Sequence, residues 1–298
     1  MKGLIVMNAY PNGEKFYRQS NRIKVELEKL GIETDVLLNG EASARLNEDG
    51  EVKSSALQYD FVVYLDKDKY LSRLLEGAGL RLFNSAQAIE TCDDKMLTYL
   101  ALVGKGVKIP ETQSAPLCYT PNAIPQTALL ERVEELGYPL VAKKSYGSFG
   151  AGVELVKTRA ELEEIEKKWL YIPHFYQKFV GKKGRDIRVI VIGGKAVGAM
   201  ERVAQDGEFR SNIELGGHGE KIELSSEYKE TAERVAEVLG LDYCGVDLLE
   251  GDTPIVCEVN SNAFFEGLEG VTGVNIAKLY AEYIVKTMKN VLMNSKNS

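Results

Sequence analysis

Apolar and polar positions in the first 85 residues alternate between strand-like and helix-like spacing. The pattern predicts strands over residues 4–8, 33–38, 61–65 and 80–83, and helices over residues 14–30 and 70–77. Ile23, Leu27 and Leu30 share one face of the first helix, and Gly31 ends it. Residues 39–58 are polar and predict a loop or hairpin. This order indicates a small open α/β layer. It lacks the GxGxxG turn of dinucleotide-binding oxidoreductases.

From residue 84 onward, the pattern predicts helices interleaved with longer β-hairpins. Strands are expected over residues 139–144, 152–157, 175–180, 187–192, 195–203, 243–249 and 254–260, and helices over residues 86–90, 94–104, 126–136, 226–239 and 272–293. Thr158 and Glu161 form a capping box that opens another helix, and Gly193-Gly194 is a hairpin turn. We expect an N-terminal domain over 1–85 and a second domain over 86–298, with subdomains at about 107–182 and 183–298.

Composition narrows the class of protein. The chain has 298 residues, of which 44% are hydrophobic and 27% charged, as in ordinary soluble globular proteins. A net charge of -7 argues against a protein that coats nucleic acid. No apolar run approaches the roughly 20 residues needed to span a bilayer, and residues 1–8 predict a strand rather than a signal peptide. We therefore expect neither nucleic acid nor membrane as a partner.

Cysteine and histidine usage exclude several chemistries. The four cysteines lie apart in the sequence without a CxxC pair, so neither a zinc site nor a disulfide framework is indicated, and a cytoplasmic location fits best. His174 lies in an apolar, aromatic stretch that favours plain packing, and His218 lies in a glycine-rich loop. Chemistry based on a Ser-His-Asp triad is therefore disfavoured, and Lys, Arg, Asp, Glu and Asn remain as candidates.

Two apolar strands carry the candidate metal ligands Asp247, Glu258 and Asn260. The strands are joined by a four-residue turn, so they should pair antiparallel. Glu258 and Asn260 are two residues apart and share one face, onto which Asp247 can project from the neighbouring strand. Two carboxylates and an amide oxygen on one face form a hard-oxygen site of the kind that Mg²⁺ prefers.

Glycines and cations around two further segments suggest anion binding. Residues 143–153 run from Lys143 into a hairpin with glycines at 147, 150 and 152, which allow backbone N–H groups to approach a phosphate closely. No Gly-Lys-Ser/Thr ends this loop, so it is not a Walker A motif. Arginines then recur in residues 184–188, at Arg202 and in residues 209–212, and guanidinium groups suit phosphate and carboxylate.

Taken together, these segments resemble the ATP-grasp superfamily, and specifically the RimK-type glutamate ligases. The resemblance covers roughly the last two-thirds of the chain. It rests on residues 84–85, 94–95, 143–152, 177–180, 184–191, 201–202, 209–212, 245–247, 258–260, 266–269 and 272–273. It implies an α/β (α+β) ATP-grasp fold of three subdomains that holds ATP between two sheets, preceded by the small open N-terminal domain.

The resemblance also implies roles for particular residues. Lys95 and Lys143 would hold ATP phosphates, Phe179 and Val180 would line the adenine pocket, and Asp186 would meet the ribose. The whole implied nucleotide-binding set is Lys95, Lys143, Gly147, Ser148, Gly150, Gln177, Lys178, Phe179, Val180, Asp186, Arg210, Ser211 and Asn212. Arg188, Arg202, Arg210 and Asn212 would act on the γ-phosphate and the reacting carboxylate. Asp247, Glu258 and Asn260 would bind two Mg²⁺ ions, with Mn²⁺ as the alternative metal.

Two positions depart from the family pattern. Many relatives carry Glu where this chain has Lys178, so the adenine amino group needs another acceptor, such as a backbone carbonyl. The familiar Glu-Val-Asn-Ala-Ser-Pro-Gly stretch is replaced after Asn260 by the bulkier residues 261–265. That loop lies near the metal ligands, so its change bears on the substrate.

The implied reaction joins a carboxylate to an amine through an acyl phosphate, with glutamate or another amino acid as one substrate. The acceptor is left open among a small molecule, a peptide and a protein C-terminus. Two alternatives remain: phosphoryl transfer without ligation, and a non-catalytic nucleotide-binding module. Relatives commonly form homo-oligomers, and the sequence leaves the oligomeric state open.

Overall fold

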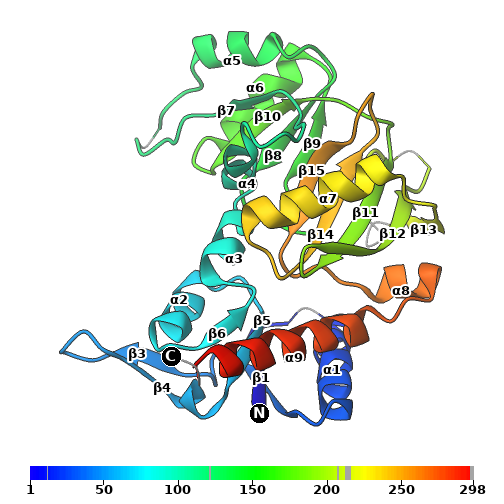
Figure 1. The fold of residues 1–298 in the computed structure, drawn as a ribbon. Helices are drawn as coiled ribbons and strands as arrows, with labels where there is room; N and C mark the ends of the chain where they lie inside the picture. Colours follow the sequence, from blue (N-terminus) through cyan, green and yellow to red (C-terminus); the bar gives the residue numbers. More distant parts are fainter. Residues whose placement is uncertain (12, 121, 207, 212–215, 296–298) are drawn as a thin grey trace.

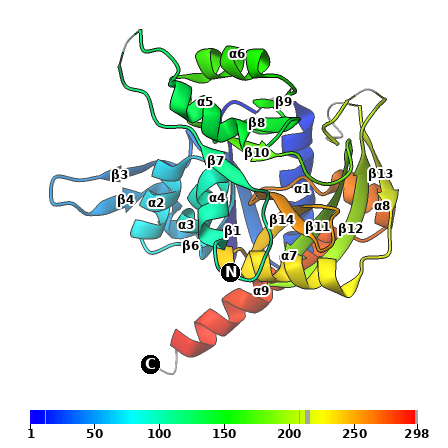
Figure 2. The ribbon, with the colours of Figure 1, turned by 90° about the horizontal axis from the view of Figure 1, so that it is seen from above.

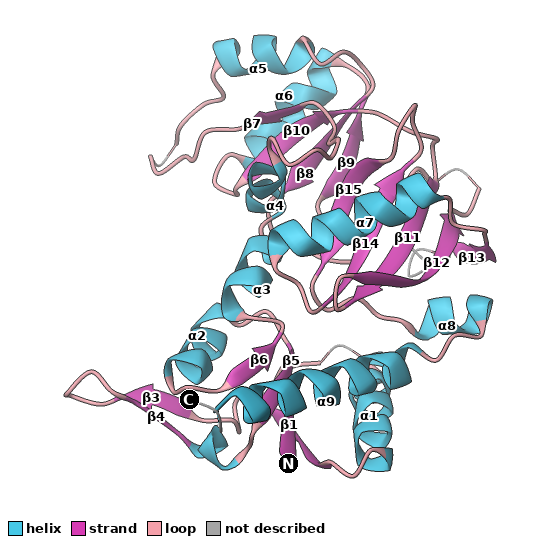
Figure 3. Cartoon of the chain, in the orientation of Figure 1, coloured by secondary structure: helices cyan, strands magenta, loops and turns pink. Residues whose placement is uncertain are grey.

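The structure is a computed structural model that describes residues 1–298 except 12, 121, 207, 212–215 and 296–298. Its described residues form three larger sheets and one small hairpin, with helices on the outer faces of the sheets (Figures 1 and 3). Within the described part of the chain, no helix is both long and apolar enough to cross a membrane.

The N-terminal sheet is parallel, with the strand order β2-β1-β5-β6. Its strands are β1 (Lys2–Met7), β2 (Glu33–Leu38), β5 (Phe61–Leu65) and β6 (Arg81–Phe83). All five residues of β5 are buried, as expected of a parallel sheet covered on both faces. Ile5 faces the core formed with α1 (Glu14–Lys29), whereas Leu4 faces the core formed with α2 (Lys69–Gly77) and α3 (Ala86–Asp93).

The polar stretch between β2 and β5, for which a loop or hairpin was predicted, forms a hairpin. Strands β3 (Ala44–Leu46) and β4 (Val52–Ser54) pair antiparallel and are followed by the 3₁₀ helix η1 (Ser55–Gln58). The hairpin projects from the N-terminal layer (Figure 1).

The middle sheet is antiparallel, with the order β7-β10-β8-β9. Its strands are β7 (Thr112–Ser114), β8 (Leu140–Lys144), β9 (Val153–Val156) and β10 (His174–Lys178). Helix α4 (Lys95–Leu102) leads from α3 toward this sheet, and α5 (Thr127–Glu134) and α6 (Arg159–Trp169) cover one face of it through a common core (Figure 3). His174 is buried there and its ring contacts the Glu166 carboxylate at 2.8 Å, in agreement with the predicted packing role.

The C-terminal sheet has the order β13-β12-β11-β14-β15 and is antiparallel throughout. Its strands are β11 (Arg185–Ile192), β12 (Lys195–Val203), β13 (His218–Lys221), β14 (Tyr243–Leu249) and β15 (Ile255–Asn260). Helix α7 (Ser226–Leu239) packs on one face against apolar residues such as Val189 and Val246. Because side chains alternate along a strand, the neighbours Arg188 and Asp247 lie on the opposite face.

The last helices pack back onto the N-terminal layer. Helix α9 (Ile276–Ser295) places Tyr280 and Ile284 in the same core cluster as Ile5 and Ile23, while its C-terminal end extends away from the body (Figure 2). The short helix α8 (Glu266–Thr272) precedes it.

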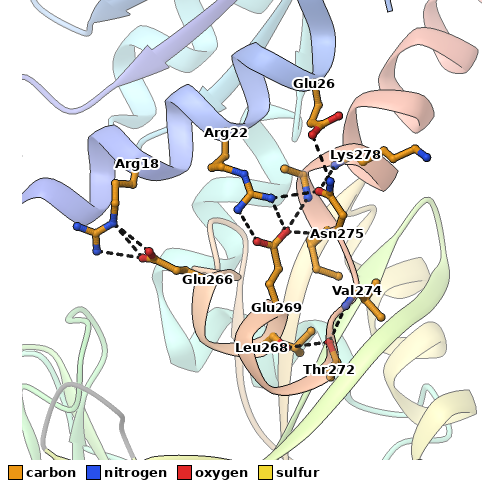
Figure 4. Close-up of polar contacts among 12 residues, drawn as sticks. Arg18, Arg22, Glu26, Glu266, Leu268, Glu269, Thr272, Val274, Asn275 and Lys278 are labelled. Carbon is orange, nitrogen blue, oxygen red and sulfur yellow. Dashed lines mark hydrogen bonds and ion pairs between the residues drawn. The ribbon is translucent and has the colours of Figure 1, made fainter. Parts of the chain in front are cut away.

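Charged contacts fix this arrangement (Figure 4). Arg22 of α1 donates to Glu269 of α8 at 2.7 and 3.1 Å, and Glu269 also accepts from the backbone N–H of Ile276, at the start of α9, at 2.8 Å. A carboxylate at a helix N-terminus is stabilising, so Glu269 both pairs with α1 and caps α9.

Most predicted elements are confirmed. The helix predicted over residues 272–293 is present as α9 but begins four residues later than predicted, and the preceding α8 was not predicted. Gly273 adopts a left-handed conformation with φ 75° and ends α8, and a new helix begins at Ile276. Strands β7 and β13 escaped prediction because both are short, polar edge strands that pair on one side only. The turn at Gly193-Gly194 is confirmed, with φ of 55° and 74° between β11 and β12.

Candidate active site

A cavity lies between the middle and C-terminal sheets and encloses about 800 Å³ of space, part of it open to solvent. We call it the inter-sheet cavity. Its lining includes predicted site residues from both sheets and their connections: Lys95, Lys143, Gly150, Gln177, Lys178, Phe179, Val180, Asp186, Arg202, Arg210, Ser211, Asp247 and Glu258. Side chains along β8 and β10 alternate between the two faces of the middle sheet. One face packs under α5 and α6, and Lys143 and Gln177 lie on the other face, toward the cavity.

The remaining predicted residues lie elsewhere. Ser148, Arg188 and Asn260 line a second cavity, described below. Gly147 is outside both linings, but its carbonyl oxygen accepts a hydrogen bond from Lys95 Nζ at 2.7 Å. Asn212 lies outside the described residues.

Gln177 has a buried polar atom that points to a ligand. Its Nε2 donates to Thr112 Oγ1 at 2.9 Å, whereas its Oε1 is buried without a hydrogen-bond partner among the described residues. Leaving such an acceptor unsatisfied costs roughly 1–3 kcal/mol. Because Gln177 lines the inter-sheet cavity, a donor on a bound molecule can satisfy this oxygen.

Two lysines reach the same cavity from different elements. Lys95, on the first turn of α4, contacts Glu258 at 3.4 Å as well as the glycine hairpin. Lys143, near the end of β8, is buried with its Nζ 3.5 Å from Tyr99 Oη and 3.8 Å from Cys257 Sγ. Burial raises the pKa of the Cys257 thiol, which keeps it neutral near pH 7.

Four charged side chains, three of them buried and Arg188 partly exposed, form a cluster on the C-terminal sheet. Asp247 is 1% exposed and accepts from Arg188 Nε and Nη2, both at 2.7 Å, and from Arg202 Nη2 at 2.8 Å. Arg202 also donates to Asp186 Oδ1 at 2.7 Å. Burial by itself raises the pKa of Asp247, but the charges and hydrogen bonds of Arg188 and Arg202 hold it below its usual value. We call these four residues the Arg–Asp cluster.

The three predicted metal ligands lie on adjacent strands. Asp247 and Glu258 face each other directly across β14 and β15, and Asn260 pairs with Gly245 two residues further on. A bulge leaves Cys257 without a cross-strand partner, and bulges commonly re-aim side chains beside functional sites. Across the described residues, the chain brings together no group of three or more His, Cys, Asp or Glu that could hold a metal ion. Two carboxylates and one amide oxygen are therefore the available donors here.

The second cavity adjoins the first and encloses about 970 Å³, part of it open to solvent. It is bounded by Asn8, Phe16, Leu65, Asp66 and Lys67 of the N-terminal domain, Ser148 and Phe149 of the glycine hairpin, and Arg188, Arg202, Glu258, Asn260, Asn262, Ala263 and Phe264. Arg202 and Glu258 line both cavities, so the two meet at the Arg–Asp cluster.

The glycine hairpin between β8 and β9 covers part of both cavities. Gly150 faces the inter-sheet cavity, whereas Ser148 and Phe149 face the second. Its tip is held by side chains from elsewhere: Arg210 donates to the Gly150 carbonyl oxygen at 3.0 Å, and Lys67 donates to Ser148 Oγ at 3.2 Å. Gly147 has φ 141°, and a Cβ there would lie 2.9 Å from the Ala151 carbonyl oxygen, so this turn requires glycine.

The contribution of the N-terminal domain escaped the sequence analysis. Asn8, Asn39 and Asp66 directly follow the parallel strands β1, β2 and β5, and the Asp66 carboxylate accepts from Asn8 at 3.0 Å and from Asn39 at 2.6 Å. The carboxyl ends of parallel strands meet at one sheet edge, where ligands commonly bind. Polar residues at the end of the predicted strand 4–8 and directly after the predicted strands 33–38 and 61–65 were therefore an available signal.

Comparisons with known proteins agree with this architecture. The "RimK domain protein ATP-grasp" of Sphaerobacter thermophilus superposes with a TM-score of 0.73 at 20% identity, covering 95% of this chain and 99% of that one. The fold is therefore the ATP-grasp fold. A family profile described as the RimK-like ATP-grasp domain matches residues 92–284. The chain belongs to the RimK-like ATP-grasp family.

Two curated relatives have informative names. The probable alpha-L-glutamate ligase of Thioalkalivibrio sulfidiphilus is 38% identical over 216 residues, which cover 71% of this chain and 69% of the relative. The N-acetylaspartylglutamate synthase A of Homo sapiens is 35% identical over 232 residues, or 76% of this chain. The chain spans 58% of the length of that human relative.

Proposed function

We propose that this protein is an ATP-dependent carboxylate–amine ligase that forms an amide bond through an acyl phosphate. One substrate is glutamate or another amino acid, and the other is a carboxylate acceptor. The observation that carries the proposal is the pair of adjoining cavities, which share Arg202 and Glu258. A ligase of this class must bring a nucleotide phosphate and a carboxylate to one point, and this geometry supplies that point.

The inter-sheet cavity takes the nucleotide. Lys95 and Lys143 approach the phosphates, and Phe179 and Val180 lie against the base. The unpaired Gln177 Oε1 accepts from the base amino group, which supplies the acceptor that Lys178 cannot. Asp186 lines the same cavity and is assigned to the ribose, in addition to its bond with Arg202.

Asp247, Glu258 and Asn260 fit a magnesium site by the chemistry of their donor atoms. When bound, Mg²⁺ neutralises charge on the phosphate oxygens. Asp247 would hold the metal with oxygens that also accept three hydrogen bonds from Arg188 and Arg202. We propose two ions, with Mn²⁺ able to replace Mg²⁺.

The reaction proceeds in two balanced steps. A carboxylate oxygen of the acceptor bonds to the γ-phosphorus as the bond from that phosphorus to ADP breaks. The amine nitrogen then bonds to the acyl carbon, phosphate leaves with the bonding electron pair, and the nitrogen loses a proton. Arg188 and Arg202 lie where the two cavities meet and stabilise negative charge on the transferring group and the carboxylate. Arg210 and Ser211 line the nucleotide cavity beside them.

The chain division follows the three regions that meet at the site. We propose an N-terminal domain over residues 1–85, a lid subdomain over about 107–182, and a metal-binding subdomain over about 183–298. The proposed partners are ATP, an amino acid and a carboxylate acceptor.

The test measures ADP release with Mg-ATP while amino acids and carboxylic acids are supplied singly and in pairs. We expect release that depends on particular substrate pairs and that falls at least a hundredfold in Glu258→Gln. The matched control is Glu250→Gln, a carboxylate on the turn after β14 that is exposed and pairs with Lys182. Release that ignores the substrates, or that Glu258→Gln leaves intact, contradicts the proposal.

A further inference from the structure

The second cavity has walls of two chemical kinds. Toward the inter-sheet cavity it presents Arg188, Arg202 and Glu258. Away from it, three aromatic rings from three separate segments come together: Phe16 of α1, Phe149 of the glycine hairpin and Phe264 of the loop after β15. We call these three rings the aromatic wall.

The rings of the aromatic wall contact one another. The Phe16 and Phe264 centroids are 5.1 Å apart and nearly perpendicular, and the Phe149 and Phe264 centroids are 6.0 Å apart. Lys15 Nζ lies 3.6 Å from the Phe149 centroid and 4.8 Å from that of Phe264, which adds a cation–π contact behind the wall. All three rings remain partly exposed although they touch, so apolar surface is left for a ligand to cover.

Phe149 occupies a backbone conformation that disfavours it. Its φ is 59°, in the left-handed region that glycine adopts readily, and a side chain there costs roughly 1–2 kcal/mol. The neighbouring positions 147, 150 and 152 are glycine. A phenylalanine in such a conformation, in a hairpin that covers both cavities, is consistent with a role of its ring in the site.

The cations of the second cavity are already matched by carboxylates. Arg188 pairs with Asp247, Arg202 pairs with Asp186 and Asp247, and Lys67 pairs with Asp93 at 2.9 Å. Asp66 and Glu258 add negative charge to the same lining. In these ion pairs Arg188 and Arg202 donate through their Nε and Nη2 atoms, so Nη1 of each can share one ligand carboxylate. A second or third carboxylate on the ligand would meet the negative charge of Asp66 and Glu258.

We infer that the carboxylate substrate of the second cavity is a monocarboxylic acid that carries an apolar or aromatic group. The carboxylate lies at Arg188 and Arg202, and the apolar group lies against the aromatic wall. This inference rests on the proposed ligase activity and specifies its substrate class. It separates this chain from the relatives that are named after glutamate-containing products. Because Gly150 faces the nucleotide cavity and Phe149 faces the second cavity, the same hairpin contacts both substrates.

The acid preference can be measured without knowing the amine. Hydroxylamine replaces the amine, because its nitrogen attacks an acyl phosphate to give a hydroxamate and phosphate, and the hydroxamate forms a coloured ferric complex. Wild-type protein with Mg-ATP and hydroxylamine is supplied with N-acetylphenylalanine, N-acetylleucine, N-acetylaspartate, N-acetylglutamate or citrate. We expect kcat/KM for the two apolar acids to exceed that for the polycarboxylic acids by at least tenfold, a ratio typical of one well-placed apolar contact.

Variants locate the preference. Phe16→Ala and Phe264→Ala should raise KM for the apolar acids about tenfold while leaving kcat and the KM for ATP within twofold. Phe264→Leu should restore part of the lost affinity, which separates loss of apolar contact from a folding defect. The control is Tyr17→Ala on the same helix, because Tyr17 is half-exposed and lines neither cavity. Thermal unfolding of each variant confirms that it is folded.

The outcomes separate the two proposals. Hydroxamate formed from aspartate, glutamate or citrate derivatives as well as from the apolar acids, or better, overturns the substrate class and leaves the ligase intact. An apolar preference that Phe16→Ala and Phe264→Ala leave unchanged overturns the role of the aromatic wall. No hydroxamate and no ADP release with any acid or amine overturns the ligase proposal itself.

Discussion

Asp247 and Glu258 are both proposed metal ligands, yet the structure gives them different tasks, and this difference can be measured. Asp247→Asn removes a charge that is 1% exposed and bonded to Arg188 and Arg202. Arg188 then loses its carboxylate partner, while Arg202 keeps Asp186. Removing one member of a buried ion pair costs about 3–5 kcal/mol. The bond that Arg202 retains places the expected loss near the lower end, at about 3 kcal/mol.

Glu258→Gln is the matched comparison. The Glu258 side chain is 26% exposed and has one charged contact, at 3.4 Å to Lys95. Its loss should cost within about 1 kcal/mol. Both variants should abolish substrate-dependent ADP release. Equilibrium urea unfolding without ligand should place the Asp247→Asn midpoint about 1 M below that of wild type, if the slope is about 3 kcal/mol/M, and leave Glu258→Gln nearly unchanged.

The pH dependence gives a second check on the same charge. The pKa of Asp247 is held below its usual value in the folded protein, so its pairing stabilises the fold above the unfolded pKa of about 3.9. That contribution is lost as the pH falls through the folded pKa. The difference in unfolding free energy between wild type and Asp247→Asn should therefore stay constant from pH 8 to pH 5 and shrink below about pH 4. Equal urea midpoints at pH 7 would refute the structural role of the Arg–Asp cluster.

Three further outcomes are expected. Glu269→Ala removes both the pairing with Arg22 and the cap on α9, so it should lower the unfolding free energy by about 2 kcal/mol. The control is Glu266→Ala on the same helix. Its arginine partner is exposed to solvent, so the urea midpoint should stay unchanged. If the glycine hairpin is a mobile lid, Mg-ATP should protect residues 146–152 from limited proteolysis, and equal cleavage with and without nucleotide rules that out. Lys143→Met should raise the KM for ATP at least tenfold with little change in the KM for the carboxylate substrate. The opposite pattern would show that Lys143 binds the carboxylate substrate and not ATP.

The sequence was sufficient for most of the fold because its strongest elements obey simple periodicities. Residues 33–38, 61–65 and 226–239 were predicted with the bounds that the structure has. The misses have two physical origins. Strands β7 and β13 are short edge strands whose side chains need not be apolar, and the break between α8 and α9 depends on one left-handed glycine within an otherwise helical pattern.

Those parts of the candidate site that lie within one sequence motif could be predicted. The parts that depend on how separate elements pack together could not. The cross-strand position of Asp247 and Glu258 follows from two strands and a short turn. In contrast, Asp247 is enclosed by two arginines, and this depends on β11 lying beside β14 and β12 lying on the far side of β11, which no local pattern specifies. The aromatic wall likewise joins residues far apart in the sequence, Phe16 and Phe264, so only the folded chain reveals it.

The position of α9 has a consequence for how the protein is made. Residues near both ends of the chain build one core, in which Ile5 and Phe61 pack with Tyr280 and Ile284. On the ribosome, the first 85 residues therefore emerge long before the helix that covers one face of their sheet. Until that helix arrives, α1 covers only part of the apolar face of β1 and β5, and the rest stays exposed to the solvent and to chaperones. A nascent chain stalled before residue 276 should thus be captured by chaperones and cleaved readily by proteases, and the ATP-grasp elements fold while the first domain is still incomplete.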